Sequence, residues 1–172
     1  TLFRVLPQTM GDIIFLGNSI TDGGEWSELF NDLRIKNRGI SGDITTGVLN
    51  RLDEVYYRKP AKVFLLIGVN DLARNISVDS IVKNIIWIAS LIKEKTPFTK
   101  LYVQSILPVN EKLGKFGGHA SKKTEILKVN KALFDSAIRY HYNYIDVFSA
   151  LSDSTGRLNT DYTNDGLHLT GP

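Results

Sequence analysis

The stretch "DIIFLGNSITDGG", residues 12–24, places a serine two residues after a run of bulky apolar side chains that stops at a glycine. Four consecutive apolar residues, 13–16, bounded by a turn signal predict a strand buried on both faces, as in a parallel sheet. Ser19 then lies just past the carboxyl end of this strand, at the edge where open α/β sheets bind their ligands. This position makes a chemical role for Ser19 worth testing.

Strands and helices alternate along the rest of the chain. Apolar runs predict strands at residues 13–16, 34–40, 61–68, 100–108 and 142–151, and apolar residues at helical spacing predict helices at 26–33, 48–56, 78–92 and 121–142. Ser77 is the predicted N-cap of the third helix. The glycine- and lysine-rich residues 109–120 predict an exposed loop. The alternation predicts an α/β fold, a three-layer α/β/α sandwich around a five-stranded parallel sheet.

Composition limits the setting. A length of 172 residues with 42% hydrophobic content predicts a single domain, 1–172. The 21 basic and 18 acidic residues are scattered, which argues against a nucleic-acid partner, and the absence of cysteine excludes disulfides and thiolate chemistry. No segment has the roughly 18 apolar residues of a transmembrane span. Because the chain starts at Thr1, we expect a periplasmic or extracellular location if a leader has been removed, and a cytoplasmic one otherwise.

The candidate chemical groups all follow strand ends, which share one rim of a parallel sheet: Ser19, Gly42, Asn70, Asp165 and His168. A serine hydroxyl needs a base, and His168 can serve if Asp165, three residues before it, holds the ring. Backbone N–H groups at Ser19 and Gly42, with the side-chain amide of Asn70, are the donors that an oxyanion hole uses. The pattern predicts acyl transfer from an ester by a serine nucleophile.

These residues resemble the four sequence blocks of the SGNH hydrolases, a branch of the GDSL lipase/esterase superfamily. The matching segments are Gly17-Asn18-Ser19-Ile20, Gly42, Gly68-Val69-Asn70-Asp71 and Asp165-Gly166-Leu167-His168. The resemblance implies a flavodoxin-like fold, with Ser19 as nucleophile, His168 as base, Asp165 as its partner, and Ser19, Gly42 and Asn70 as the oxyanion hole. The chain departs from the family in having Asn18 where the GDSL name has aspartate. The family continues into a helix after the histidine, so we expect a C-terminal helix to be missing from residues 1–172.

Each of these residues also has a purely structural interpretation. Ser19 could cap a helix, and Asn70 could form an Asx turn, but neither explains the convergence on one rim. His119, in the glycine-rich loop, and His141, at a helix end, lack a matched partner and are predicted to have no catalytic role. Trp26 and Trp87 stand at helical core spacing and are predicted to be packing residues.

The substrate is predicted from what the chain lacks. No long apolar insertion suggests a lid or a deep acyl tunnel, so we expect a short acyl group such as acetyl. Similar family members include carbohydrate O-acetylesterases and acetylhydrolases of the platelet-activating-factor type, and we expect deacetylation of a sugar or glycan, with a lysophospholipase or thioesterase as the alternative. Asn110 and Glu111 follow the fourth predicted strand onto the same rim and are predicted to contact substrate.

A binding module is the alternative from a different class. The loop after the first strand could hold a phosphate or a flavin without hydrolysis, because helix N-termini and turn amides bind anions. The chain has no phosphate-binding glycine motif, and such a module has no need of Asp165 and His168. Asp22, Asp43 and Asp71 could be imagined with His168 as a metal site, but no two of these residues stand at a familiar ligand spacing, so we expect neither a metal nor another cofactor.

Overall fold

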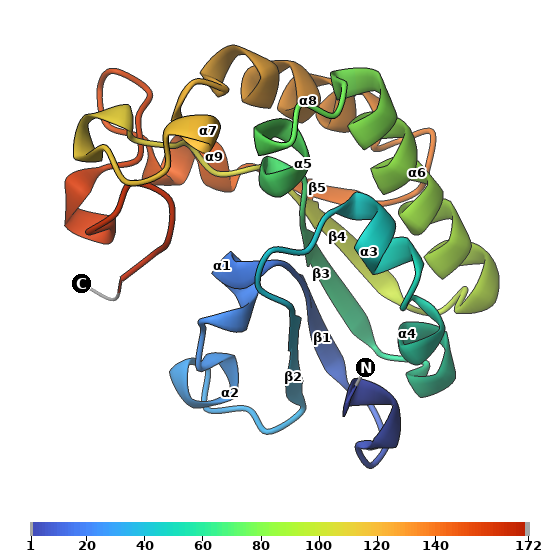
Figure 1. Ribbon diagram of the computed structural model, residues 1–172. Helices are drawn as coiled ribbons and strands as arrows, with labels where there is room; N and C mark the ends of the chain where they lie inside the picture. The colour runs from blue at the N-terminus through green and yellow to red at the C-terminus, as the bar shows by residue number, and fades with distance from the viewer. Residues whose placement is uncertain (1, 171–172) are drawn as a thin grey trace.

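The computed structural model describes residues 2–170, and its centre is a five-stranded, all-parallel sheet with the strand order β2-β1-β3-β4-β5 (Figure 1). The strands are β1 (Ile13–Gly17), β2 (Ile35–Gly39), β3 (Lys62–Leu66), β4 (Lys100–Gln104) and β5 (Asn143–Ile145). After β1, the chain forms β2 on one side of β1 and then crosses over to form β3 on the other side of β1. This reversal places the carboxyl ends of β1 and β3 next to each other, as a topological switch point does. The predicted α/β sandwich is confirmed.

Helices lie on both sides of the sheet. They are α1 (Ser19–Asp22), α2 (Trp26–Leu29), α3 (Thr45–Leu49), α4 (Asp53–Arg58), α5 (Val69–Ala73), α6 (Val78–Lys95), α7 (Gly117–Ala120), α8 (Lys123–Ser136) and α9 (Val147–Leu151), with 3₁₀ turns at Leu2–Val5, Glu111–Leu113 and Thr160–Tyr162. The long helix α6 packs against α3, α4 and α8 on one face, whereas α1 and α2 pack beside β2 on the other side (Figure 1). Ser77 caps α6 as predicted, since its Oγ accepts the N–H of Ser80.

The two faces of the sheet are buried to different extents. On the face toward α6, side chains such as Ile14, Leu65 and Val103 are fully buried. On the opposite face Phe15 and Phe64 are only half-buried and stack on each other with ring centroids 4.9 Å apart. The prediction that the first strand is buried on both faces therefore holds for one face, because α2 is too short to cover the other.

Several predicted boundaries differ from the observed ones. The helix predicted at 26–33 stops at Leu29, two residues before the left-handed Asn31, and Leu33 is 85% exposed. The last strand ends at Ile145 because the Asp146 carboxylate caps α9 by accepting the N–H of Ser149.

Other expected burial patterns also changed. The helix predicted to reach residue 142 ends at Ser136, and Ile138 is 91% exposed rather than buried. Trp87 is 56% exposed and is not a core residue. The predicted loop at 109–120 contains two short helical turns and begins with the buried Val109.

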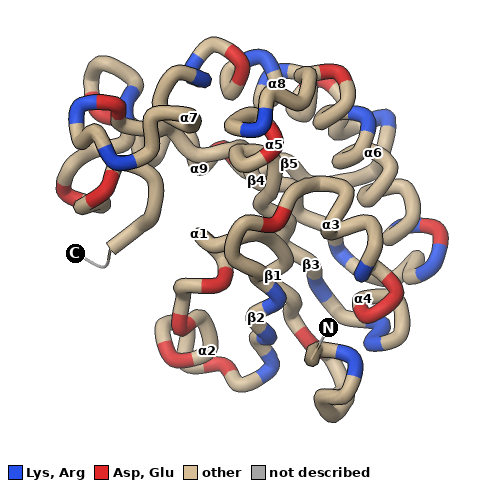
Figure 2. The backbone as a smooth tube through the Cα atoms, viewed as in Figure 1, with Lys and Arg blue, Asp and Glu red and all other residues tan. Residues whose placement is uncertain are grey.

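Charges of both signs alternate over the surface of α4, α6 and α8 (Figure 2). Within residues 2–170, no helix combines the length and the apolar character that a bilayer crossing requires. The helix expected after His168 lies outside the described residues.

Candidate active site

The apolar run of β1 stops at Gly17 because the next helix folds directly back onto the strand end. A side chain at Gly17 would lie 2.3 Å from the hydroxyl of Thr21 and 2.4 Å from the carbonyl oxygen of Leu66. Asn18 is buried, and its Oδ1 caps α1 by accepting the N–H of Ile20 at 3.0 Å. This capping needs no charge, so asparagine performs it. Ser19 is thereby fixed as the first residue of α1.

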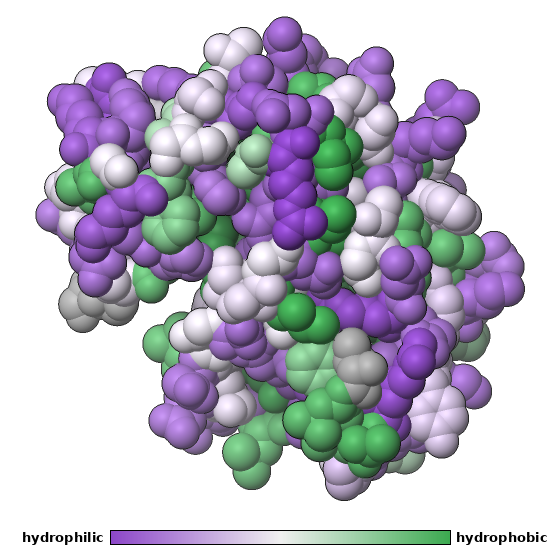
Figure 3. Space-filling view, in the orientation of Figure 1, coloured by the Kyte–Doolittle hydropathy of each residue, from purple (hydrophilic) through white to green (hydrophobic). Residues whose placement is uncertain are grey.

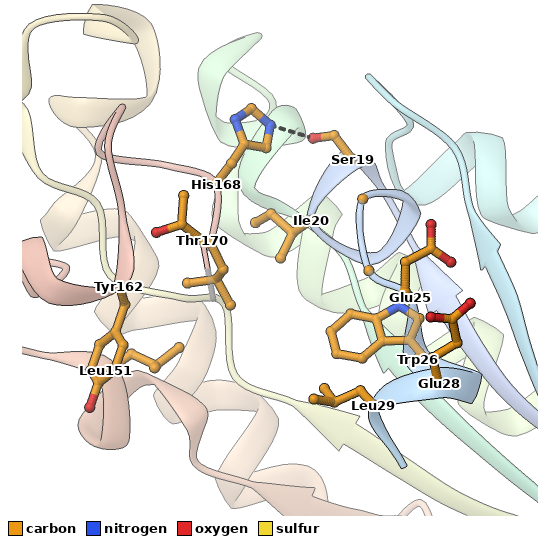
Figure 4. A pocket seen from close by; sticks show the side chains of 13 residues that line it. Ser19, Ile20, Glu25, Trp26, Glu28, Leu29, Leu151, Tyr162, His168 and Thr170 are labelled. Carbon is orange, nitrogen blue, oxygen red and sulfur yellow. Dashed lines mark hydrogen bonds between the residues drawn. The ribbon is translucent and has the colours of Figure 1, made fainter. Parts of the chain in front are cut away.

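The structure brings Ser19, His168 and Asp165 together in one hydrogen-bonded row. Ser19 Oγ lies 2.9 Å from Nε2 of His168 (Figure 4). Nδ1 of His168 lies 2.8 Å from Oδ2 of Asp165. When Nδ1 donates its proton to Asp165, Nε2 is free to accept the Ser19 hydroxyl proton. The row therefore has the order that general-base activation of a serine requires.

A turn built around Asp165 holds the histidine. Oδ1 of Asp165 accepts the backbone N–H groups of Leu167 and His168, each at 2.8 Å. Burial opposes the charged form of this carboxyl group, but the hydrogen bonds from the backbone and from the imidazole outweigh it and hold its pKa at about 2. Asp165 is thus ionised at neutral pH and can stabilise a positive charge on His168.

The three predicted oxyanion donors are the N–H groups of Ser19 and Gly42 and the side-chain amide of Asn70. The N–H of Ser19 stands at the first helical position and has no acceptor within α1. Gly42 has φ +78°, a left-handed conformation that favours glycine. Nδ2 of Asn70 donates to the carbonyl oxygen of Asp43 at 2.9 Å, which leaves its second proton for another acceptor.

The loop that carries Gly42 is held from several sides. The buried carboxylate of Asp71 accepts both the N–H and the hydroxyl of Thr45, and Nη2 of Arg74 donates to the carbonyl oxygen of Gly42 at 2.8 Å. Burial raises the pKa of Asp71 despite the hydrogen bonds from Thr45. Arg51, also buried, pairs with Asp43 in the same loop. Asp71 and Arg51 therefore hold the segment that follows Gly42.

A pocket of about 810 Å³ opens beside Ser19 and His168. Its other lining residues come from the α1–α2 segment and from the chain that starts at the last residue of α9: Ile20, Gly23, Gly24, Glu25, Trp26, Glu28, Leu29, Leu151, Tyr162, Leu169 and Thr170 (Figure 4). The space-filling view shows the molecule hollowed between these two parts (Figure 3). The lining is largely apolar, and Glu25 and Glu28 are the only carboxylates among its described residues, which include no Lys or Arg.

Trp26 has more than the packing role predicted for it. One face of its indole stacks on Phe15, with centroids 5.1 Å apart, and its N–H donates to the carbonyl oxygen of Thr21. The ring also lines the pocket, which the helical spacing of the sequence could not indicate.

Among residues 2–170, no three His, Asp or Glu side chains are grouped as metal ligands would be.

The structure does not bring Asn110 and Glu111 to the pocket. Asn110 is buried, its side-chain amide donates to the carbonyl oxygen of Leu158, and its N–H donates to that of Gly166 at 2.9 Å. Glu111 pairs with Arg157 at the surface. Both side chains therefore support the chain segment that carries the candidate base, and neither lines the space beside Ser19.

His119, predicted to have no catalytic role, contacts Asn70, a residue of the candidate site. Its Nε2 is 3.0 Å from Oδ1 of Asn70, and its ring packs edge-on against Phe116. The signal for this was absent from the sequence, because the contact joins a residue of the short helix α7 to a residue of α5, 49 positions away. His141 lies at the end of the segment after α8, with a left-handed φ of 55°.

The chain is similar to several known proteins. The pattern of the GDSL-like lipase/acylhydrolase family matches residues 15–172. The chain is 29% identical over 166 residues to the human platelet-activating factor acetylhydrolase IB subunit alpha2, covering 93% of this chain and 69% of the relative. A solved structure from Streptococcus pneumonia is 32% identical, with a TM-score of 0.88 over 98% of this chain and 81% of that one. A GDSL-like lipase from Bacteroides thetaiotaomicron is 26% identical, with a TM-score of 0.81 over 99% and 86% of the two chains.

Proposed function

Because the chain belongs to the GDSL-like lipase/acylhydrolase family and is an ester hydrolase of that type, we propose that Ser19, His168 and Asp165 are its catalytic triad and that it removes short acyl groups, chiefly acetyl, from carbohydrates. The observation that carries the proposal is the 2.9 Å contact between Ser19 Oγ and His168 Nε2, with Asp165 behind the imidazole.

The proposed reaction has two halves. Ser19 Oγ attacks the ester carbonyl carbon while Nε2 of His168 takes the hydroxyl proton, and the imidazolium then gives this proton to the departing alcohol. Water, deprotonated by the same nitrogen, attacks the acyl-serine, and the proton returns to Ser19 Oγ as the acid leaves. The N–H groups of Ser19 and Gly42 and the amide of Asn70 are the proposed donors to the oxyanion in both halves.

Three features support an acetyl group on an uncharged alcohol. The curated relatives carry the name acetylhydrolase. The carboxylates of Glu25 and Glu28 at the pocket disfavour an anionic substrate, and they also weigh against the phosphate- or flavin-binding alternative. The pocket side of the Trp26 indole offers the flat apolar surface on which a sugar ring can pack.

A lysophospholipase or thioesterase remains the second candidate. The specific observation that favours it is the size and apolar lining of the pocket, about 810 Å³, which has room for a longer hydrocarbon chain.

The test uses 4-nitrophenyl acetate, butyrate and octanoate, acetylated xylo-oligosaccharides, and a fluorophosphonate probe. We expect activity to fall with acyl length, acetate release from the oligosaccharides, and a covalent adduct on Ser19 that is lost in Ser19→Ala but retained in the matched control Ser27→Ala. Turnover that rises from acetate to octanoate would favour the second candidate. Hydrolysis by folded Ser19→Ala would discard the nucleophile.

A further inference from the structure

His119 stands in direct contact with one of the proposed oxyanion donors. It lies on α7, half-buried, and its Nε2 is 3.0 Å from Oδ1 of Asn70. An amide oxygen can only accept, so the proton in this bond belongs to His119. The proposed mechanism uses Asn70 and gives His119 no role of its own.

This contact fixes which end of the amide faces the reaction. Nδ2 of Asn70 donates to the carbonyl oxygen of Asp43, and Oδ1 accepts from His119, so the amide is held at both ends. If the Asn70 amide were rotated by 180°, its Oδ1 would face the carbonyl oxygen of Asp43, and two acceptors would oppose each other. The same rotation would present an oxygen, rather than an N–H, to the developing negative charge. The second proton of Nδ2 is available to the oxyanion only in the observed orientation.

The same short segment also contacts the candidate base. Phe116 packs edge-on against the ring of His119, with centroids 5.7 Å apart, and edge-on against the ring of His168, with centroids 5.3 Å apart. One turn of chain thus touches both the donor side and the base side of the site.

We propose that His119 is a positioning residue for ester hydrolysis, which holds the Asn70 amide with its N–H toward the oxyanion. The proposal rests on the proposed function of the same site. Burial and the proximity of His168 lower the pKa of His119, so His119 is neutral at neutral pH and adds no positive charge against the imidazolium that forms on His168.

A double-mutant cycle with Asn70 tests this role. We expect His119→Ala to lower kcat about tenfold with little change in KM, a smaller loss than that of Asn70→Ala because the donor is kept but no longer oriented. His119→Gln, whose amide N–H can reach the same acceptor, should recover most of the loss. Adding His119→Ala to Asn70→Ala should change kcat by less than about twofold.

The matched control is His141→Asn, which removes the other histidine outside the triad and suits the left-handed backbone there. It should leave kcat unchanged. The proposal would be overturned if His119→Ala lowered kcat by the same factor in the wild type and in Asn70→Ala. Full activity of His119→Ala would also overturn it.

A readout without turnover separates this inference from the proposed function. In ¹⁵N-labelled protein, the side-chain amide signals of Asn70 should shift or broaden in His119→Ala and return toward their positions in His119→Gln. Unchanged Asn70 signals would refute the positioning role even in an active enzyme. Absence of Ser19 labelling in the wild type, with shifted Asn70 signals, would refute the proposed function alone.

Discussion

Ser19 Oγ and His168 Nε2 lie 2.9 Å apart although 149 positions separate the two residues in the chain. The first stands on the helix that follows strand β1, and the second on a turn near the end of the described chain. The turn is tied to the sheet through Asn110, whose N–H donates to the carbonyl oxygen of Gly166. The triad geometry thus depends on the packing of the chain after β4 as much as on β1.

Asn70→Ala should lower kcat by a few hundredfold and leave KM nearly unchanged, because a lost oxyanion donor costs on the order of 3 kcal/mol in the transition state only. Steady-state kinetics with 4-nitrophenyl acetate measures both constants. If KM rose by a similar factor while kcat stayed unchanged, Asn70 would not be an oxyanion donor.

Asp165→Asn should lower kcat by about 10⁴-fold while the protein stays folded. The new side chain keeps an oxygen for the backbone N–H groups of Leu167 and His168, but its NH₂ group then faces Nδ1 of His168 and imposes the wrong tautomer. Turnover and thermal unfolding of the same preparation check both parts. Activity within tenfold of the wild type would contradict the triad assignment.

Asp165 should also make stability depend on acid. Its pKa of about 2 in the folded protein lies below the ordinary value of 3.8, so its contribution to the free energy of unfolding is complete above the ordinary value and is lost as the pH falls toward 2. Urea unfolding of wild type and Asp165→Asn should therefore differ more at pH 7 than at about pH 2.5. A difference that does not change with pH would argue against an ionised, hydrogen-bonded Asp165.

Removal of the pocket carboxylates should change the preference between charged and uncharged esters. With Glu25→Gln/Glu28→Gln, we expect kcat/KM for 4-nitrophenyl hemisuccinate to rise about threefold at low salt relative to the neutral acetate ester, and the gain to shrink at high salt. The control is Glu94→Gln, because Glu94 is paired with Lys95 at the surface of α6. A ratio of rates that stays constant would show that Glu25 and Glu28 do not act on the substrate.

Glu54→Gln should destabilise the fold by about 3 kcal/mol or more, because it leaves the buried Arg38 without its carboxylate and Arg58 with Asp12 alone. Glu54 pairs with Arg38 at 2.9 Å and also with Arg58, and Arg58 in turn donates to the carbonyl oxygens of Phe3 and Leu6. Urea unfolding measures the loss, and Glu94→Gln, in an exposed pair, should cost less than about 1 kcal/mol. Similar values for both variants would mean that the buried cluster does not support the N-terminal segment.

The amino-acid sequence by itself determined the parallel sheet and the strand ends at which Ser19, Gly42 and Asn70 stand. It also placed Asp165 three residues before His168, and the Asx-type turn at Asp165 is a local structure. These features could be predicted because apolar periodicity, turn residues and short spacings act within a few residues of chain. Some predicted ends of helices were wrong, such as the end of the second helix at Leu33. The observed ends depend on local breaks, such as the left-handed backbone at Asn31, and on how much apolar surface of the sheet each helix covers.

Only the tertiary structure decided which loop side chains meet around the site. It brought His119 against Asn70, placed the indole of Trp26 in the pocket, and gave Asn110 a buried role in place of the predicted contact with substrate. Loop residues carry no periodic pattern, and their neighbours depend on how segments far apart in the chain pack over a common sheet edge. Local signals therefore identify the residues that stand at strand ends, whereas the partners of those residues follow from the fold as a whole.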